Sequence, residues 1–338
     1  MGTKFGISGQ SMQEILSYTT STSGFRVTER WFSDDRSHIS IGIANIHTGV
    51  KDIEANKNKI LHAIDIFKEK KVNLAIFPEF CLSGYFWEDE EDCRRFMDQA
   101  VIENHSEWID KILRSYLDDT LKGVVLNCLR KGQSGKYINS TYYINKDEDF
   151  LQTNHLYDKV FLPKIEKLYT ETTGDDLLVL EGDYGRFGFT TCYDICFSQL
   201  LLEYSKIERV DAIIEVASWR SLAFRDYPGM NVGTDIYYAA LWDMILPAQA
   251  ATNQVWIIAC NSVGRHEISG AEFAGGSGLW SPSGMKLVQA SRFNEELLIV
   301  HNVDIHGQLK IEKDDFNYAL DFNDIYRPVD CRRCFTRI

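Results

Sequence analysis

Short β-type runs alternate with segments of helical periodicity along most of this chain. A compact apolar run at 39–47 is followed by apolar residues at helical spacing and then by a second run at 72–80. The order strand, helix, strand favours parallel pairing of these two runs. The pattern continues with strands expected at 123–129, 137–145, 185–191, 211–218, 254–261 and 296–304, and helices near 100–119, 197–207 and 235–252. We therefore predict an α/β layered fold, to which adjacent strands after residue 120 add antiparallel pieces.

No Pro/Gly/Ser-rich linker divides the body of the chain. Its 338 residues are 44% hydrophobic and 12% aromatic, which is ample for a large core. Residues 1–38 are rich in Ser and Thr and lack apolar periodicity, so we interpret them as an extension that is partly ordered at most. We expect a single domain over residues 39–338.

Charge and cysteine usage limit the partners and the compartment. The formal net charge of -13 disfavours nucleic acid and anionic membranes as main partners, because phosphate would be repelled. No run approaches the roughly 18 consecutive apolar residues of a spanning helix, and the N-terminus lacks a signal-peptide core. Eight cysteines without a secretion signal indicate reduced thiols in a cytoplasmic protein. We interpret the lone CxxC of Cys331 and Cys334 as incidental, because no second pair has zinc-ligand spacing.

Cys192 lies where an expected strand gives way to a helix. It follows Phe187, Phe189 and Thr191, which alternate along the strand. A cysteine taken at random is usually an inert, small apolar side chain. At a strand-to-helix junction, however, the partial positive charge of backbone N–H groups favours thiolate and can hold a developing oxyanion. Cys192 is therefore a candidate nucleophile.

Glu79 and Lys159 are candidate partners for this thiol. The apolar run LAIFPEF presents Glu79 at the carboxyl edge of the sheet, where ligands collect and where Cys192 also emerges. Lys159 lies in the aromatic and apolar segment HLYDKVFLP, where an unpaired ammonium would be costly. It could stabilise an oxyanion, and Glu166, further along the same segment, could orient it. The alternatives are a solvated strand-end glutamate and a surface lysine.

Taken together, these motifs resemble the nitrilase, or carbon-nitrogen hydrolase, superfamily from about residue 39 to the C-terminus. The resemblance rests on FPEF with Glu79, YDKVFLP with Lys159 and GRFGFTTCYD with Cys192, in the family's order. The segments CNSVG, FAGGSGLWSPSG and RPVDCRR support it. Three ordered motifs with matching flanks are far more specific than any one of them.

The resemblance implies an αββα sandwich that forms a homodimer or a higher homo-oligomer across its helical face, with no metal and no organic cofactor. It further implies that Glu79 is the general base and that Cys192 attacks. Lys159 and the backbone N–H of Tyr193 would stabilise the oxyanion. Glu166 resembles the family's second glutamate, which positions the lysine and the substrate.

The residues that follow the nucleophile favour an amide or an N-carbamoyl amine as the small-molecule substrate. Nitrile hydrolysers of the family continue with Trp and Glu, whereas Tyr193 and Asp194 resemble the amidase and carbamoylase branches. No cation follows directly, so a substrate carboxylate would need Arg220, Arg225 or another source. Gln249 stands where the family often carries Arg.

Three aromatic residues near expected strand ends are candidates for the apolar walls of a substrate pocket. They are Tyr85, Trp219 and Trp280. A packing role in the core is an equally good interpretation of each.

The expected reaction is attack of the thiol on a carbonyl, giving a thioester that water resolves with release of ammonia or an amine. Alternatives are a nitrile substrate, capture of the thioester by an amine as in acyltransferase relatives, and ammonia supply to a separate synthetase chain. An alternative of another class is a non-catalytic binding or assembly protein that keeps the fold. The presence of Glu79, Lys159 and Cys192 together argues against it.

Overall fold

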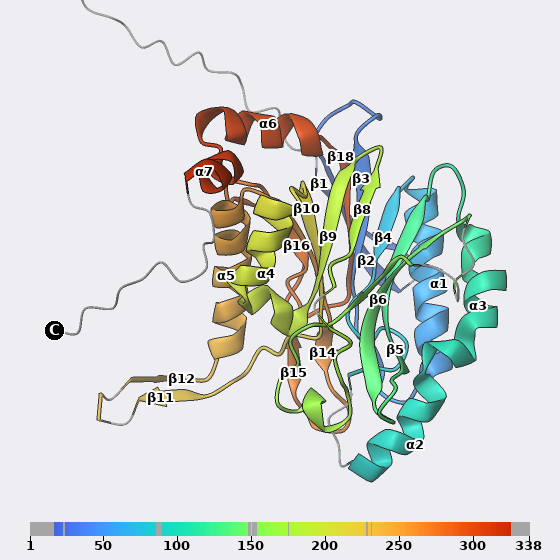
Figure 1. Ribbon diagram of the computed structural model, residues 1–338. Coiled ribbons are helices and arrows are strands. Elements are labelled where there is room, and N and C mark those ends of the chain that lie inside the picture. Colours follow the sequence, from blue (N-terminus) through green and yellow to red (C-terminus); the bar gives the residue numbers. More distant parts are fainter. Residues whose placement is uncertain are drawn as a thin grey trace, which may run out of the picture.

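Two large β-sheets pack face to face and carry helices on both outer sides (Figure 1). The computed structural model describes residues 17–22, 24–85, 90–147, 150, 154–174, 176–227, 229–230 and 232–325. Cys331 and Cys334 lie outside the described residues. The predicted α/β layered fold is confirmed, and its layers are those of an αββα sandwich.

The first sheet has eight strands in the order β1-β2-β18-β3-β4-β5-β6-β7. Their bounds are β1 (Ser17–Thr22), β2 (Phe25–Trp31), β18 (Glu296–Val303), β3 (Ile39–Asn45), β4 (Leu74–Ile76), β5 (Gly123–Lys131), β6 (Tyr137–Asn145) and β7 (Leu156–Asp158). Strands β3, β4 and β5 pair in parallel, as the strand, helix, strand pattern predicts. Strands β5 and β6 form the expected antiparallel piece.

The second sheet has six strands in the order β17-β16-β13-β10-β9-β8. Their bounds are β17 (Lys286–Gln289), β16 (Gly278–Trp280), β13 (Trp256–Asn261), β10 (Ala212–Ala217), β9 (Gly185–Thr191) and β8 (Val179–Gly182). Strands β9, β10 and β13 are parallel. Two small hairpins complete the strands: β11 (Arg225–Tyr227) with β12 (Val232–Thr234), and β14 (Val263–Arg265) with β15 (Glu272–Ala274).

Helices cover the outer face of each sheet (Figure 1). On the first sheet lie α1 (Ile53–Glu69), α2 (Glu90–Ala100) and α3 (Ser106–Lys111), and on the second lie α4 (Ser198–Leu202) and α5 (Tyr237–Asn253), while α6 (Ile305–Asp315) and α7 (Tyr318–Ile325) lie at one end. Helix α1 begins where Asp52 accepts a hydrogen bond from the N–H of Ala55 (3.3 Å). No helix among the described residues has both the length and the apolar character needed to cross a membrane.

The core between the sheets explains why the strand segments read as nearly continuous apolar runs. Ile41 and Ile76 from the first sheet meet Phe189 and Ile214 from the second in one buried cluster. Each is at most 1% exposed, and burying one such side chain stabilises the fold by roughly 1.5–3 kcal/mol. A sheet that is covered on both faces has no solvent-facing side, so its strands do not alternate polar and apolar residues.

Ordered structure begins before the position that the sequence analysis expects. Strand β2 pairs in parallel with the distant β18, and β1 pairs antiparallel with β2. Phe25 and Val27 of β2 are 5% and 0% exposed and belong to the core under α1. The Ser/Thr-rich stretch before it masks this strand in the overall composition of residues 1–38, although FRVTERW itself alternates buried and more exposed positions. Its partner β18 comes from the other end of the chain.

Candidate active site

Cys192 lies at the junction of β9 and the short 3-10 helix η5 (Cys192–Cys196), as the sequence predicts. Its backbone is left-handed (φ 54°), a conformation that costs a non-glycine residue on the order of 1–2 kcal/mol. A reciprocal capping box holds the turn: the Thr191 side chain accepts from the backbone of Asp194, and Asp194 Oδ2 accepts from the Thr191 N–H (3.1 Å). Hydrogen bonds between Thr191 and Asp194, which lie before and after Cys192, therefore hold the strained turn.

Asp194 ties this turn to the segment that carries Lys159. Its carboxylate also accepts hydrogen bonds from the Tyr157 hydroxyl (2.7 Å) and from the N–H of Phe161 (2.8 Å). Burial raises the pKa of Asp194 to about 6, although Lys159 and these donors act in the opposite direction. At neutral pH the side chain is thus a charged acceptor for three donors.

Lys159, Glu79 and Glu166 form one buried, hydrogen-bonded group. The Lys159 ammonium donates to Glu79 Oε1 (2.8 Å) and to Glu166 Oε1 (2.6 Å), and all three residues are 0% exposed. The Tyr85 hydroxyl donates to Glu166 Oε1 (2.8 Å). The structure brings together the three predicted charged residues, although Glu79 lies 80 residues before Lys159 in the chain.

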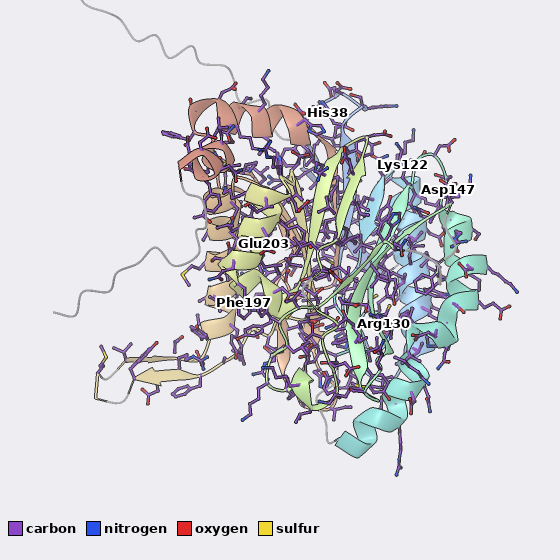
Figure 2. The ribbon with its side chains drawn as sticks, viewed as in Figure 1. His38, Lys122, Arg130, Asp147, Phe197 and Glu203 are labelled. Atoms are coloured by element: carbon purple, nitrogen blue, oxygen red, sulfur yellow. The ribbon has the colours of Figure 1, made fainter. Side chains whose placement is uncertain are left out.

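Four strands place this group at one edge of the sandwich. Glu79 follows β4, Lys159 follows β7, and Glu166 begins the 3-10 helix η4 (Glu166–Leu168). The Arg130 side chain, labelled in Figure 2, pairs with Asp158 immediately before Lys159. Strands β6 and β10 supply further hydrogen-bond donors to the group.

Asn139 and Ser218 are site residues that the sequence analysis missed. Asn139 on β6 donates from Nδ2 to Glu79 Oε1 (2.8 Å) and to Glu166 Oε2 (3.3 Å). Ser218, directly after β10, donates its N–H to Glu79 Oε2 (2.9 Å) and its hydroxyl to the Glu79 carbonyl (2.9 Å). Asn139 is 0% exposed, but Ser140 and Thr141 follow it on β6 and are buried as well, so the sequence held no signal that singled it out.

The buried charges shift the pKa values of Lys159 and Glu166. Burial alone would lower the pKa of Lys159, but the carboxylates of Glu166 and Glu79 outweigh it and raise that pKa well above its usual range. Burial raises the pKa of Glu166, against the opposing effect of Lys159. Lys159 is therefore an ammonium at neutral pH.

The resting state of Cys192 differs from the sequence-based expectation. Burial raises the pKa of the Cys192 thiol well above its usual range, and the charge of Glu79 is the second-largest cause of this rise. Lys159 lowers that pKa, but its effect is smaller. The sequence analysis expected the backbone N–H groups of the turn to favour a thiolate. That expectation left out the neighbouring carboxylate and the loss of solvent, which hold Cys192 as a thiol.

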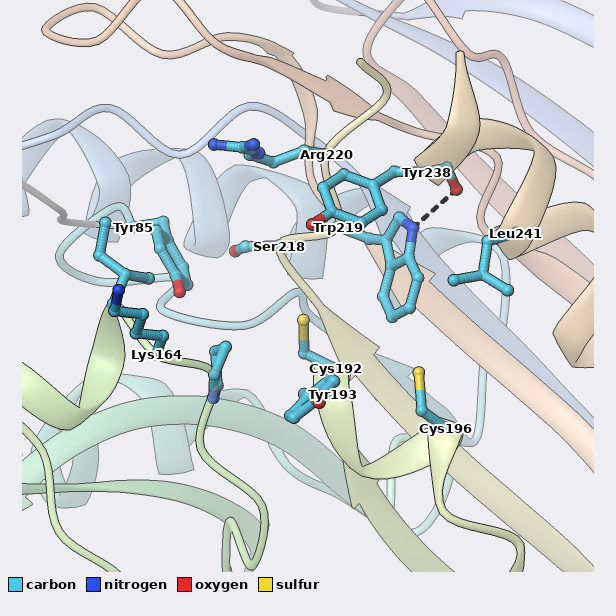
Figure 3. A pocket seen from close by; sticks show the side chains of 12 residues that line it. Tyr85, Lys164, Cys192, Tyr193, Cys196, Ser218, Trp219, Arg220, Tyr238 and Leu241 are labelled. Atoms are coloured by element: carbon cyan, nitrogen blue, oxygen red, sulfur yellow. Dashed lines mark hydrogen bonds between the residues drawn. The ribbon is translucent and has the colours of Figure 1, made fainter. Parts of the chain in front are cut away.

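Cys192 faces a cavity of about 430 Å³. The residues that line it are Tyr85, Pro163, Lys164, Ile165, Cys192, Tyr193, Cys196, Ser218, Trp219, Arg220, Tyr238 and Leu241. Figure 3 shows the Cys192 thiol pointing between Tyr85 on one side and Trp219 and Leu241 on the other. This volume lies in the range of small-molecule sites.

Tyr85, Trp219 and Arg220 line the cavity, but Trp280 does not. The prediction for Trp280 is wrong because its strand β16 pairs with β13 and turns the indole into the core, where it is 1% exposed. Arg225 is not among the lining residues. Gln249 lies beneath the site instead, where its side chain donates to the Ile195 carbonyl (3.0 Å) in η5.

Metal ligands do not gather near the thiol. Within the part of the chain that the structure describes, no three His, Cys, Asp or Glu side chains come together in a way that could hold a metal ion. The carboxylates of the site bind Lys159 instead.

Two packed sheets with outer helices, and a cysteine, a lysine and two glutamates at one edge, define a nitrilase-type αββα fold. The family model "Carbon-nitrogen hydrolase" matches residues 40–306. The chain belongs to the carbon-nitrogen hydrolase family, and it is an enzyme that acts on carbon-nitrogen bonds.

Relatives agree with this assignment over most of the chain. A protein of Schizosaccharomyces pombe named "Probable nitrilase" is 23% identical over 286 residues, which is 83% of this chain and 94% of that protein. An omega-amidase of Xenopus tropicalis is 30% identical over 53% of this chain and 60% of its own. A mutant amidase from Nesterenkonia, solved with an acetamide moiety covalently attached to its active-site cysteine, has a TM-score of 0.63 and 18% identity, covering 83% of this chain and 97% of its own.

Proposed function

We propose that this chain hydrolyses an amide or an N-carbamoyl amine through a thioester on Cys192, releasing ammonia or an amine. The observation that carries the proposal is the group of Glu79, Lys159 and Glu166, buried and hydrogen-bonded beside a thiol that faces a cavity. A structural core has no need of two carboxylates and an ammonium at this depth, because desolvating ions is costly. The omega-amidase relative and the acylated Nesterenkonia amidase support the choice of an amide.

Glu79 is the general base in this proposal. Its Oε1 accepts from both Lys159 and Asn139, whereas the described contacts give Oε2 one donor, the N–H of Ser218. A carboxylate oxygen has two lone pairs, so Oε2 keeps one for the thiol proton. Ser218 also lines the cavity, which places this oxygen behind the cavity wall.

The remaining groups serve the tetrahedral intermediate. The sulfur of Cys192 adds to the carbonyl carbon as Glu79 takes the thiol proton, and the carbonyl oxygen becomes an oxyanion. Lys159 and the backbone N–H of Tyr193 hold that oxyanion, since the first turn of a helix leaves such N–H groups without an intrahelical partner. Glu79 then delivers the proton to the leaving nitrogen, and water attacks the thioester with Glu79 again as base. Glu166 positions Lys159.

A panel of amides, N-carbamoyl amines and nitriles with matched carbon skeletons tests the proposal. We expect ammonia or amine release from the first two classes and an acyl adduct on Cys192 by mass spectrometry. Cys192→Ala should abolish both results. Cys128→Ala is the matched control, because that thiol is 1% exposed in the core on the α1 side and should leave the reaction intact.

The same panel separates the alternatives. Turnover of nitriles without amides would contradict the choice of substrate. Product formation only with an added amine acceptor would indicate acyl transfer, and turnover confined to glutamine would indicate ammonia supply to a synthetase. If no substrate acylates Cys192 and its removal changes nothing, the chain is a non-catalytic member of the family.

We also propose a homodimer or a larger homo-oligomer. Helix α5 is apolar on nearly all sides, and its Met244 is 61% exposed. A helix of this kind is normally covered. The β11–β12 hairpin projects from the same side (Figure 1) and exposes Tyr227 and Val232. Sedimentation of the protein and of Met244→Asp checks this: the substitution should shift the particle toward the monomer, and a wild-type monomer contradicts the proposal.

A cytoplasmic location agrees with the state of the thiols. The described cysteines Cys81, Cys128, Cys192, Cys196 and Cys260 are all free. A reducing compartment keeps them so. Imaging of a fluorescent fusion would check the location. Independence from nucleic acid and membranes stays a prediction from the net charge.

A further inference from the structure

Asn127 is a buried polar residue of β5 that the proposed mechanism does not use. It is 0% exposed, and it is not among the residues that line the cavity. Its side-chain oxygen accepts from the N–H of Phe80 (2.8 Å), and its Nδ2 donates to Asn139 Oδ1 (2.7 Å) and to Thr141 Oγ1 (2.9 Å). Both N–H groups and the oxygen of this amide therefore have partners, and a buried group bonded in this way is rigid.

The contact with Asn139 fixes the orientation of that side chain. Because the Asn139 oxygen faces Asn127, its Nδ2 donates to Glu79 Oε1 (2.8 Å) and to Glu166 Oε2 (3.3 Å). A flipped Asn139 amide would place its oxygen against both carboxylates and its NH2 group against the NH2 group of Asn127. Asn127 thereby selects the amide orientation that holds the two glutamates.

The contact with Phe80 holds the backbone directly after Glu79. Phe80 has a left-handed backbone (φ 52°), which is unfavourable for a residue with a side chain. Its N–H donates to the side chain of Asn127, and the next N–H along the chain, that of Cys81, donates to the Asn127 carbonyl (3.2 Å). Asn127 therefore binds the turn that follows the proposed base at two successive positions.

The contact with Thr141 continues from the first sheet to the second. Thr141 lies opposite Asn127 on β6, and its Oγ1 lies 3.0 Å from Thr191 Oγ1 on β9. Both threonines are 0% exposed. Thr191 directly precedes Cys192, and its side chain caps the turn η5. One chain of hydrogen bonds thus runs from the proposed base to the nucleophile.

We propose that Asn127 is a positioning residue that holds the Glu79 carboxylate and the Cys192 turn in one fixed relative geometry. It acts through Asn139 and Thr141, and not on the substrate. This inference rests on the proposed hydrolysis at Cys192 and adds a residue to it. A displacement of about 1 Å between reacting groups can cost roughly a hundredfold in rate, so a contact behind the cavity wall is as important as one within it.

Asn127→Leu tests the inference, because it keeps the approximate size of the side chain and removes its hydrogen bonds. We expect kcat to fall roughly 10- to 100-fold, since base and nucleophile lose their alignment. KM should stay within about threefold, because Asn127 does not line the cavity. Thr141→Val, a milder variant, removes the link between the sheets and leaves the contacts of Asn127 with Phe80 and Asn139. It should lower kcat about twofold to tenfold.

Asn127→Asp separates positioning from packing, because the two side chains have the same shape. An ionised carboxylate has no donor for Asn139, whereas a protonated carboxyl group can donate one hydrogen bond to Asn139 Oδ1. The ratio of kcat/KM in this variant to the wild-type value should therefore rise as the pH falls. The same ratio for Asn127→Leu should not change with pH, because leucine does not titrate. Equal ratios at every pH in the two variants would contradict the role of the donors.

Asn73→Leu is the matched control for a purely structural loss. Asn73 Oδ1 accepts from the N–H of Ser40 (2.7 Å), and its Nδ2 donates to the Thr120 carbonyl (3.0 Å). It precedes β4, whereas Glu79 follows that strand. Both Asn73→Leu and Asn127→Leu should lower the urea midpoint, but only the second should lower kcat per folded molecule. A lower midpoint with wild-type kcat in Asn127→Leu overturns the positioning role while the hydrolysis stands.

Labelling with iodoacetamide separates the two levels of the proposal, because it needs no turnover. Asn127→Leu should slow the labelling of Cys192 and leave that of Cys196, which lines the same cavity, unchanged. If this result is obtained but the wild type turns over no amide or N-carbamoyl amine, the proposed hydrolysis fails and the positioning role stands. If neither labelling nor kcat changes, the positioning role is overturned.

Discussion

The Nζ atom of Lys159 lies 2.6 Å from Oε1 of Glu166, and neither side chain is exposed to solvent. The same ammonium also binds Glu79. Removing one partner from such a group leaves an uncompensated buried charge, which is far more harmful than breaking a surface ion pair. This difference leads to the first prediction.

Lys159→Ala should lower kcat/KM on the order of a hundredfold or more, because the cation that we propose as the oxyanion stabiliser is lost. It should also lower the free energy of unfolding by about 3–5 kcal/mol, since two buried carboxylates lose their counter-charge. Urea denaturation and steady-state kinetics measure the two effects. Lys167→Ala, an exposed lysine on the same segment, should change neither; equal losses in both variants would contradict a role for Lys159.

Tyr85 and Glu166 should behave as a coupled pair. Tyr85→Phe removes the donor to Glu166 Oε1 and should lower kcat/KM roughly tenfold, because a hydrogen bond to a charged group contributes about 1.5–3 kcal/mol. Glu166→Gln should lower it further. The double variant should lose less transition-state stabilisation than the two single variants lose in sum, as expected for side chains in direct contact. Strict additivity would show that the two residues act independently.

The pKa of about 6 for Asp194 predicts an acid limb in the pH profile. As the pH falls through about 6, the carboxylate takes up a proton and can no longer accept from Thr191, Tyr157 and Phe161 in the same way. The turn that holds Cys192 then loosens, so kcat/KM should fall toward low pH, be half-maximal near pH 6 and level off at higher pH. Asp194→Asn should lower the plateau and remove this limb, which a pH series of kcat/KM measures. An unchanged limb in that variant would assign it to another group.

Cys192 should be alkylated by iodoacetamide before the core thiols. It is 9% exposed, whereas Cys81 and Cys260 are 0% exposed. Burial and the charge of Glu79 both raise its pKa, so the reaction depends on a base. Glu79→Gln removes the base together with the repelling charge, and because burial is the larger cause of the raised pKa, we expect the loss of the base to dominate and the labelling of Cys192 to slow. Cys196 lines the same cavity and serves as the internal reference, because Glu79→Gln should not change its rate. Peptide mass mapping at several times gives the rates. Slowing of Cys192 and Cys196 alike would falsify the assignment of Glu79 as its base.

Val27→Asp should destabilise the protein by more than about 3 kcal/mol, because it places an unpaired charge in the core beneath α1. Thr19→Asp on the neighbouring β1 is the control, since Thr19 is exposed and a surface substitution changes stability by about 0.5 kcal/mol at most. Urea denaturation compares the two. Equal stabilities would mean that β2 is dispensable to the fold.

Much of this architecture was predictable because it is local. Strand β9 spans the residues that the sequence indicated, 185–191, since an apolar run between turn signals needs no distant information. The motifs around Glu79, Lys159 and Cys192 identified their residues for the same reason. Strand β2 escaped prediction because residues 1–38 were judged by their overall Ser and Thr content, although FRVTERW itself alternates buried and more exposed positions.

The site itself was only partly predictable. Asn139 and Ser218 belong to it through contacts with Glu79, which lies far from both in the sequence. Trp219 and Trp280 were indistinguishable as strand-end aromatics, yet one lines the cavity and the other is buried in the core. Which face of a sheet a side chain occupies depends on register, and register depends on the neighbouring strands.

The sequence by itself determined the order of strands and helices and the chemical character of the reactive residues, because periodicity and side-chain type are properties of short segments. Tertiary structure decided which of those residues meet and which charges they carry. Glu79, Lys159 and Glu166 become one group only when β4 and β7 end at the same edge, and the raised pKa of Cys192 exists only once packing has removed water from the thiol. Proximity and desolvation arise between segments that are distant along the chain, so they appear only in the folded protein.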